Sequence, residues 1–173
     1  RLHAQPELSV LEGFDEVVLA TGVEPRIPAI TGIEHEKVMT YIDVIEERRI
    51  PGKRVAVIGA GGIGFDVAEW LSHDHALESK QSFYNEWGID ISGAQRGGLK
   101  QSSLSPSPRT VYLLQRKKDK LGKNLGKTTG WIHRLSLKHR QVEMVSGVSY
   151  VRIDDDGLHI LVNGEPRVLD VDS

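Results

Sequence analysis

The sequence contains no cysteine, and this absence removes several kinds of chemistry at once. Without thiols the chain can form no disulfide, no cysteine nucleophile and no thiolate-held metal or iron–sulfur cluster of its own. Long apolar runs are also missing, because none approaches the roughly 20 residues that a membrane-spanning helix needs. No secretory signal peptide stands at the start. We therefore predict a cytoplasmic protein without a membrane partner.

A charge excess of one sign is lacking as well. The 22 Lys and Arg residues nearly balance the 24 Asp and Glu residues, and the formal net charge is −2. This balance indicates no general nucleic-acid-binding surface. The 173 residues suffice for one domain and part of another. Because the chain begins without an initiator Met and stops at residues 170–173 as a further strand begins, we expect a piece of a longer protein.

What the sequence does contain is an apolar run over residues 54–58 that leads directly into closely spaced glycines. Gly59, Gly61 and Gly64 satisfy G-x-G-x-x-G, and a stretch with helical periodicity follows them. In a dinucleotide site one such glycine makes a tight turn, one lets the backbone approach a pyrophosphate, and one permits close helix–strand packing. The amides and dipole at the helix start then face the phosphates. We predict that a dinucleotide binds at this turn, which comprises Gly59, Ala60, Gly61, Gly62, Ile63 and Gly64.

The segments around this turn alternate between strand and helix patterns. β-type runs occupy residues 15–22, 54–58, 110–115 and 142–145, and helical patterns occupy about 42–50, 63–71 and 128–139. Further β runs at 148–153, 158–162 and 167–171 are separated by Asp-Gly and Asn-Gly, which are strong hairpin signals. We predict a Rossmann-like, three-layer α/β NAD(P)-binding domain, with a parallel sheet and a small antiparallel β-meander.

Residues 76–108 carry no sustained period and form a long insertion. A loop of this length in a compact domain is usually a lid, a binding loop or a flexible insertion. Three aromatic residues within 81–87 favour an ordered start, whereas the serines and prolines within 102–108 favour a mobile second half.

The end of the second strand selects between NAD and NADP. An acidic residue there binds the 2′-hydroxyl of NAD, whereas Arg suits the 2′-phosphate of NADP. The sequence has Arg116 followed by Lys117 and Lys118, with no acid before Asp119. Its distance from the glycines greatly exceeds the usual ~20 residues, and the insertion accounts for the excess. A solvated basic turn is the alternative, but the cation cluster favours NADPH.

Three other patterns do not carry a site. His73 and His75 resemble a metal pair, but they follow the end of a helix and no further ligand is apparent nearby, so no metal is predicted. Residues 120–128 resemble a P-loop, but Leu121 stands where the first glycine is required and no strand precedes it. The acidic triplet at 154–156 is better explained by a turn than by calcium, because no EF-hand spacing follows.

Several runs of the sequence resemble one enzyme family closely. They are residues 59–66, 85–90, 114–117, 125–134, 147–150 and 153–159. Over nearly the whole chain from Phe14, the sequence is similar to the C-terminal region of bacterial NADPH-dependent 2,4-dienoyl-CoA reductases. These are iron–sulfur flavoenzymes of the NADH:flavin oxidoreductase/trimethylamine dehydrogenase-like family.

The resemblance implies a larger protein with an FMN-containing barrel, a 4Fe-4S cluster, and paired FAD and NADPH domains. NADPH would pass a hydride to FAD, and electrons would reach FMN through the cluster to reduce a 2,4-dienoyl-CoA in unsaturated fatty-acid oxidation. The family's catalytic residues lie in the barrel, so this chain holds none and is not expected to be catalytically complete. The resemblance places the glycines at the NADPH pyrophosphate, Arg116 and Lys117 at the 2′-phosphate, and Ala20, Thr21 and Gly22 beside FAD.

These implications divide the chain into two parts. Residues 1–50 would be the end of an FAD-domain strand with a linker, and residues 51–173 an NADPH-binding domain truncated before its closing strand. Its partners would be NADPH and the FAD domain and FMN barrel of the same full-length chain. Two alternatives remain, namely the equivalent domain of a related barrel-flavin enone reductase or amine dehydrogenase, and a non-catalytic dinucleotide-binding module. The sequence alone does not choose the substrate or the oligomeric state.

Overall fold

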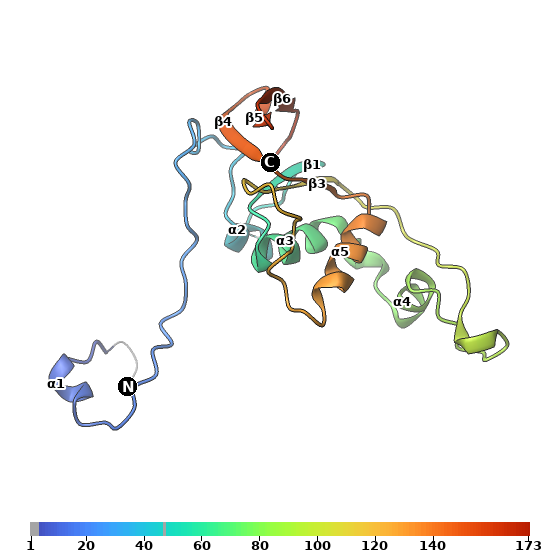
Figure 1. Ribbon diagram of the computed structural model, residues 1–173, viewed down its shortest axis with the longest axis horizontal. Coiled ribbons are helices and arrows are strands. Elements are labelled where there is room, and N and C mark those ends of the chain that lie inside the picture. The colour runs from blue at the N-terminus through green and yellow to red at the C-terminus, as the bar shows by residue number, and fades with distance from the viewer. Residues whose placement is uncertain (1–3, 47) are drawn as a thin grey trace.

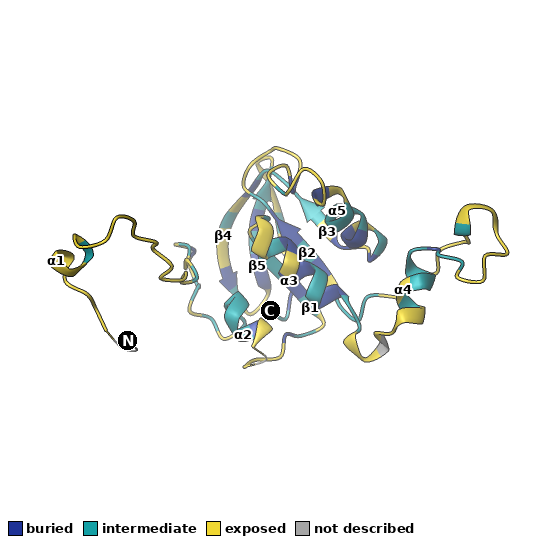
Figure 2. Ribbon diagram, turned by 90° about the horizontal axis from the view of Figure 1, so that it is seen from below, coloured by how far each residue is buried: buried dark blue, intermediate teal, exposed yellow. Residues whose placement is uncertain are grey.

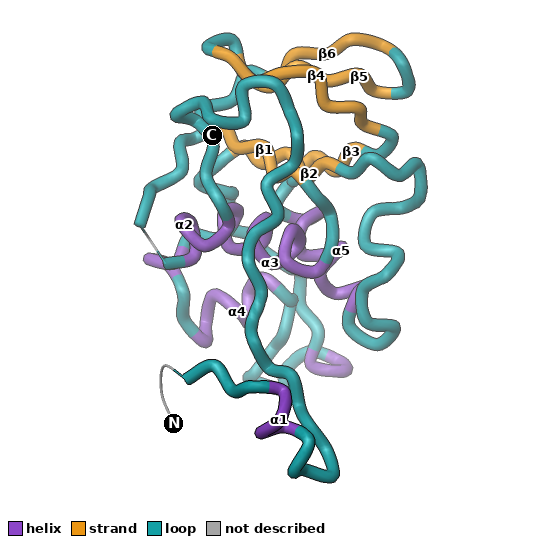
Figure 3. The backbone as a smooth tube through the Cα atoms, turned by 90° about the vertical axis from the view of Figure 1, so that its left-hand side faces the viewer, coloured by secondary structure: helices purple, strands orange, loops and turns teal. Residues whose placement is uncertain are grey.

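A computed structural model describes residues 4–46 and 48–173 and shows a body of three layers (Figures 1 and 3). The middle layer is a parallel sheet in the order β1-β2-β3, formed by β1 (Arg54–Ile58), β2 (Thr110–Leu114) and β3 (Glu143–Val145). Two helices cover one face, and they are α3 (Gly62–Ser72) and α5 (Gly130–His139). The other face carries an antiparallel sheet of β4 (Val148–Asp154), β5 (Gly157–Val162) and β6 (Glu165–Leu169). The predicted fold class is confirmed.

Alternating side chains of the parallel strands fill two separate cores. Side chains of successive residues in a strand point to opposite faces of its sheet. Val111 and Leu113 of β2 therefore pack with α3 and α5, in a cluster that includes Phe65. Leu114 packs on the opposite face against the antiparallel sheet, in a cluster that includes Ile160. The middle sheet is thus buried on both faces, as its continuous Val/Leu runs predict.

Helix α3 differs from the expectation in one respect. Within the helical pattern over residues 63–71 the apolar residues recur at Ile63, Val67 and Leu71, and Val67 and Leu71 are buried. Ile63, however, is exposed, while Phe65 is fully buried. Ile63 lies in the first turn of the helix, beyond the strand ends, whereas Phe65 reaches Leu121 in the helix-side core. The spacing therefore identifies most of the buried face, and it fails only in the first turn of the helix.

The N-terminal part of the chain is extended and lies apart from the body (Figure 2). Residues 8–11, which the sequence leaves open between strand and helix, form the single turn α1 (Leu8–Leu11). The strand predicted over residues 15–22 does not form, because within the described residues no neighbouring strand pairs with this segment. Val18 and Leu19 are 88% and 81% exposed. A β-type sequence without a hydrogen-bonding neighbour stays extended but unpaired.

The proline-containing linker returns the chain to the body before β1. Thr31 bridges Arg152 of β4, and a short helix α2 (Tyr41–Ile45) follows. A capping box starts this helix: the Asp43 amide donates to Thr40 Oγ1 (3.2 Å) and the Thr40 amide donates to Asp43 Oδ2 (2.8 Å). The helix ends at Ile45, earlier than the predicted helical pattern over about 42–50.

Residues 79–108, called the arm below, project from the opposite side of the body (Figures 1 and 2). A 3-10 turn η1 (His75–Leu77) leads into it, and it contains the helix α4 (Lys80–Glu86) and a second 3-10 turn η2 (Arg96–Gly98). Arg140 at the end of α5 donates from Nη2 to both carboxylate oxygens of Glu86, at 2.8 Å each. The helical start agrees with the predicted ordered first half of the insertion.

The last residues of the chain lie beside β1. The Asp172 amide donates to the Arg54 carbonyl (2.8 Å), and Asp172 Oδ2 accepts from the amides of Lys53 (3.0 Å) and Arg54 (2.9 Å). Hydrogen bonding from the Arg54 side chain is the largest cause that lowers the pKa of Asp172 to about 2. No helix in the described part of the chain is long and apolar enough to cross a membrane.

Candidate dinucleotide-binding site

The glycine turn between β1 and α3 has the geometry that its sequence predicts. Gly59 has φ of +116°, a conformation that side chains rarely allow. A Cβ atom on Gly64 would lie 1.8 Å from the Gly59 carbonyl oxygen, so only glycine lets the helix approach the strand this closely. Gly61 and Gly62 differ, because a Cβ there would meet nothing within 4 Å. Open space therefore adjoins the backbone where the pyrophosphate is predicted.

No side chain at the start of α3 competes with an anion for the first amides of the helix. Its N-cap is Gly61, which provides no capping side chain, and the first turn contains no acidic residue. The first amides of an α-helix have no partner within the helix, and they carry the positive end of its dipole. The amides that can donate hydrogen bonds to an anion therefore lie beside the open space at Gly61 and Gly62.

The end of β2 lies next to the glycine turn. Ile58 pairs with Leu114 in register, and the Gly59 amide donates to the Leu114 carbonyl (3.0 Å). Arg116 and Lys117 follow at the same edge of the sheet, and both are exposed. Among the described residues neither of them forms an ion pair. The two predicted phosphate sites are therefore neighbours, with exposed cations at the second one.

Hydrogen bonds hold the basic turn after β2 in place. Gln115 Nε2 donates to the carbonyls of Lys117 (3.0 Å) and Asp119 (2.9 Å). The Gly147 amide also donates to the Lys117 carbonyl (3.1 Å). The sequence analysis did not identify Gln115 as a positioning residue, because the pairing depends on how the turn folds back. The turn thus presents its cations from a fixed backbone.

Tyr150 of β4 is a second residue that the sequence analysis missed. Its hydroxyl oxygen is buried and has no hydrogen-bond partner within residues 4–46 and 48–173. Burial raises the pKa of Tyr150 to about 12, although the positive charge of Arg116 opposes the rise. The hydroxyl therefore stays protonated near neutral pH and remains a donor close to Arg116.

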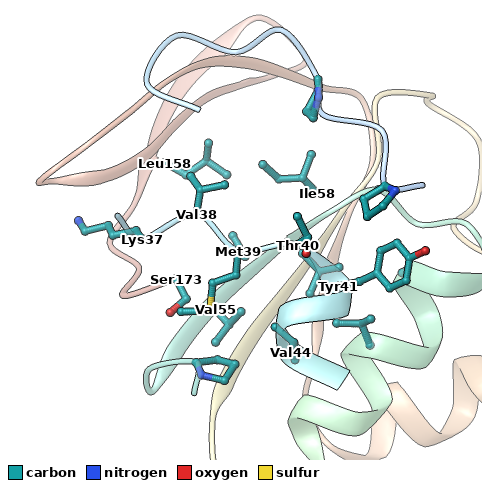
Figure 4. Close-up of a pocket in the computed structure, with 18 of the residues that line it drawn as sticks. Lys37, Val38, Met39, Thr40, Tyr41, Val44, Val55, Ile58, Leu158 and Ser173 are labelled. Atoms are coloured by element: carbon teal, nitrogen blue, oxygen red, sulfur yellow. The ribbon is translucent and has the colours of Figure 1, made fainter. Parts of the chain in front are cut away.

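A cavity of about 390 Å³ lies on the side of β1 that faces away from β2. Gly59, Gly61 and Ile63 line it at the glycine turn, and Pro25 and Pro28 line it from the linker. Figure 4 shows the segment from Lys37 to Tyr41 facing Val55 and Ile58 across the cavity. Most of the lining is apolar, so the cavity suits a flat ring better than a charged group.

Ala20, Thr21 and Gly22 are not brought to this site. All three are exposed in the extended N-terminal segment, and Gly22 has no atom within 4 Å of the position of an added Cβ. Gly22 has φ of +81°, a backbone conformation that favours glycine. Their predicted place beside FAD therefore stays a prediction.

The two histidines that the sequence analysis set aside lie close to a third polar side chain. His73 and His75 converge on Glu78 through the turn η1. Residues at i and i+3 lie side by side in a helical turn, so the spacing of His75 and Glu78 could have predicted their contact. The rule applies only to helical turns, however, and residues 76–108 were predicted as a loop. Glu78 is therefore a further potential ligand beside the two histidines, and the prediction that none lies nearby is wrong.

Residues 10–173 match the sequence profile of the family described as pyridine nucleotide-disulphide oxidoreductase. A metal reductase of Desulforamulus reducens is 25% identical over 166 residues, which are 95% of this chain and 24% of that protein. A mercuric reductase of Lysinibacillus sphaericus is 25% identical over 159 residues, which are 90% of this chain and 23% of that protein. The chain thus spans about a quarter of the length of these relatives.

A solved structure of 2-naphthoyl-CoA reductase in complex with 2-naphthoyl-CoA superposes with a TM-score of 0.64 at 21% identity, covering 89% of this chain and 18% of that one. At this identity the likeness shows the fold alone.

The family match overturns the resemblance to 2,4-dienoyl-CoA reductases. The matching profile and the relatives that cover most of the chain, metal and mercuric reductases, indicate a different family. The resemblance gave weight to local runs such as residues 125–134, which a shared dinucleotide-binding fold can hold in several families. The predicted FMN barrel and 4Fe-4S cluster lose their support with it. The prediction of an oxidoreductase family with a dinucleotide-binding fold stands, and the chain belongs to the pyridine nucleotide-disulphide oxidoreductase family.

Proposed function

We propose that residues 51–173 are the NADPH-binding domain of a longer flavin-dependent oxidoreductase, and that they hold NADPH for hydride transfer to an FAD bound elsewhere in that protein. The observation that carries this proposal is the open space beside Gly61 and Gly62, next to the exposed Arg116 and Lys117 at the neighbouring strand end. NADPH supplies the hydride when bound, and this chain's own residues bind and orient it.

The glycine turn and the basic turn would hold the phosphates of NADPH. The pyrophosphate fits against the Gly61–Gly62 backbone, where the amides of the first turn of α3 are available to an anion. The adenosine half would lie toward β2, because its 2′-phosphate needs cations and Arg116 and Lys117 stand there without ion-pair partners in the described chain. This charge pairing favours NADPH over NADH.

The cavity beside β1 would receive the nicotinamide half. A dinucleotide whose pyrophosphate is at the glycine turn and whose adenosine is at the end of β2 extends in the other direction, toward the edge of β1 that faces away from β2. The cavity lies at that edge, adjoins Gly59 and Gly61, and has an apolar lining that excludes water from a flat ring. We place FAD beyond it, with residues 1–50 as the linker from the FAD domain and Ala20, Thr21 and Gly22 beside that flavin.

Filling the open space beside the glycine turn tests the phosphate site. Gly61 has φ of −82° and ψ of −172°, which valine accepts, so Gly61→Val adds a side chain without backbone strain. We expect the variant to keep its melting temperature and to bind NADPH at least about 10-fold more weakly, since the branched side chain occupies the pyrophosphate position.

Gly13→Val is the matched control, because a Cβ on that exposed glycine makes only an ordinary 3.7 Å contact with the Val10 carbonyl. Titration calorimetry of both variants with NADPH gives the comparison. Unchanged NADPH affinity in Gly61→Val would place the dinucleotide elsewhere.

A further inference from the structure

Three side chains converge at the C-terminal end of α3, where the chain leaves the body for the arm. His73, His75 and Glu78 each offer a ligating atom, and these atoms lie within 4.8 Å of one another. Glu78 Oε1 lies 3.1 Å from His73 Nδ1 and 2.7 Å from His75 Nδ1. Two imidazole nitrogens therefore point at one carboxylate oxygen.

The two ring nitrogens of His75 have different partners. His75 Nε2 lies 3.1 Å from the Trp70 carbonyl oxygen, which can only accept a hydrogen bond. Nε2 therefore donates its proton to this carbonyl, and Nδ1 is the ring nitrogen that faces the Glu78 carboxylate. This close contact needs a positive charge between the two atoms, which either a proton on Nδ1 or a metal cation supplies. Metal-bound histidines have this arrangement, because their outer N–H donates to a carbonyl or carboxylate.

His73 supplies the second nitrogen under matching constraints. Its Nδ1 is buried and has no hydrogen-bond partner in the described part of the chain, since its approach to Glu78 lacks hydrogen-bond geometry. Its Nε2 faces Glu86 Oε2 at 3.9 Å, and Arg140 holds that carboxylate with two hydrogen bonds. A buried nitrogen without a partner destabilises the fold, so its occurrence here calls for a partner.

We propose that His73 Nδ1, His75 Nδ1 and Glu78 Oε1 bind one divalent transition-metal cation, preferably Zn²⁺, with water in the remaining position. Two imidazoles and one carboxylate form a ligand set that suits Zn²⁺, whereas Ca²⁺ and Mg²⁺ prefer oxygen ligands alone. The cation satisfies the buried nitrogen of His73 and takes the place of a proton between His75 and Glu78. The cation links Glu78, the first residue after η1, to His73 at the end of α3, and so fixes where the arm leaves the body.

The other group of candidate ligands in the described residues does not share these features. Asp154, Asp156 and His159 also lie within ligand distance of one another. The Asp154 carboxylate, however, already accepts from Arg152 Nε (2.7 Å) and pairs with His159 Nε2 (2.8 Å). An arginine on the carboxylate supplies the positive charge that a metal would bring, so this second group serves as a control.

The metal site does not rest on the proposed dinucleotide function. Helix α3 has 11 residues, with the glycine turn before its first residue and the metal ligands after its last. At 1.5 Å per residue the two sites are roughly 16 Å apart.

The test uses the complete chain, freed of metal with a chelator and titrated with ZnCl₂ by calorimetry. We expect one Zn²⁺ per chain, with a Kd on the order of 1 μM or tighter. The double variant His73→Ala/His75→Ala should weaken binding at least about 100-fold, and Glu78→Gln, which keeps the shape but removes the charge, about 10-fold. His159→Gln should bind Zn²⁺ as the parent does.

A spectroscopic readout keeps the test decisive if the double variant fails to fold. The ring of Trp70 lies 5.1 Å from that of His75, so Cu²⁺ at this site should quench the emission of Trp70. The quenching should be reduced in Glu78→Gln at a matched, sub-saturating Cu²⁺ concentration and should be lost in Trp70→Phe. Zn²⁺ binding only in the millimolar range, or binding that survives Glu78→Gln and falls in His159→Gln, would overturn the proposal.

Discussion

The body and the N-terminal segment are built from the same kinds of residue, but they differ completely in burial. Leu113 and Leu114 of β2 are fully buried, because β1 and β3 pair with the strand and layers cover both faces. Val18 and Leu19 belong to an equally apolar run and are almost fully exposed. The comparison shows that a β-type sequence specifies a strand only where a neighbouring strand and a covering layer are present.

The largest expected effect comes from truncating one leucine in each region. Leu113→Ala removes fully buried atoms from the core between the sheet and α3, and it should lower the free energy of unfolding by roughly 2–5 kcal/mol. Leu19→Ala should change it by less than about 0.5 kcal/mol, because that side chain is in water already. Chemical denaturation monitored by circular dichroism measures both. Similar losses in the two variants would mean that the N-terminal segment packs on the body.

The next effect separates the two roles of the glycine turn. Gly64→Ala would place a Cβ against the Gly59 carbonyl, and it should cost roughly 1–3 kcal/mol of stability or more because the helix must move from the strand. Gly62→Ala meets open space and should leave the stability unchanged or slightly higher, since alanine favours helix. Thermal unfolding distinguishes them. Equal melting temperatures would show that the close helix–strand approach is not needed.

A smaller effect is expected from acid. The pKa of Asp172 is lowered to about 2 from an ordinary value of 3.8, first by hydrogen bonding from the Arg54 side chain and then by the Arg54 amide. A lowered folded-state pKa contributes stability above the unfolded value and loses it as the pH falls toward the folded one. The parent chain should therefore lose melting temperature between pH 4 and pH 2.

Asp172→Asn removes this contribution at every pH. Its melting temperature should be lower than the parent's near neutral pH and should change less between pH 4 and pH 2. Asp154, whose pKa is also lowered to about 2, remains in both proteins and supplies the same background. Parallel pH profiles for the two proteins would contradict the role given to Asp172.

The sequence predicted the body well because its signals are local or periodic. The glycine spacing identifies the β1–α3 turn, and the Asp-Gly and Asn-Gly turns identify the meander. The strand at residues 15–22 was predicted wrongly, because its pattern cannot show whether a partner strand is present. Gln115, Tyr150 and Glu78 were missed for a related reason, since their contacts arise only when distant or turn-bound segments fold together.

The family resemblance failed on a different ground. Residues near the glycine turn serve a binding geometry that many oxidoreductases share, so agreement there is weak evidence for one substrate. The match over residues 10–173 identifies the family, and a family of this breadth includes oxidoreductases with different substrates.

The most direct test compares the affinities of NADPH and NADH for the parent chain and for Arg116→Ala, by calorimetry at one fixed salt concentration. The parent should bind NADPH more tightly, and Arg116→Ala should lose about 10-fold for NADPH, or ~1.4 kcal/mol, with NADH within about twofold. Arg96→Ala, which removes an exposed arginine from the arm, should behave as the parent. Equal affinity of the parent for both nucleotides would contradict the account.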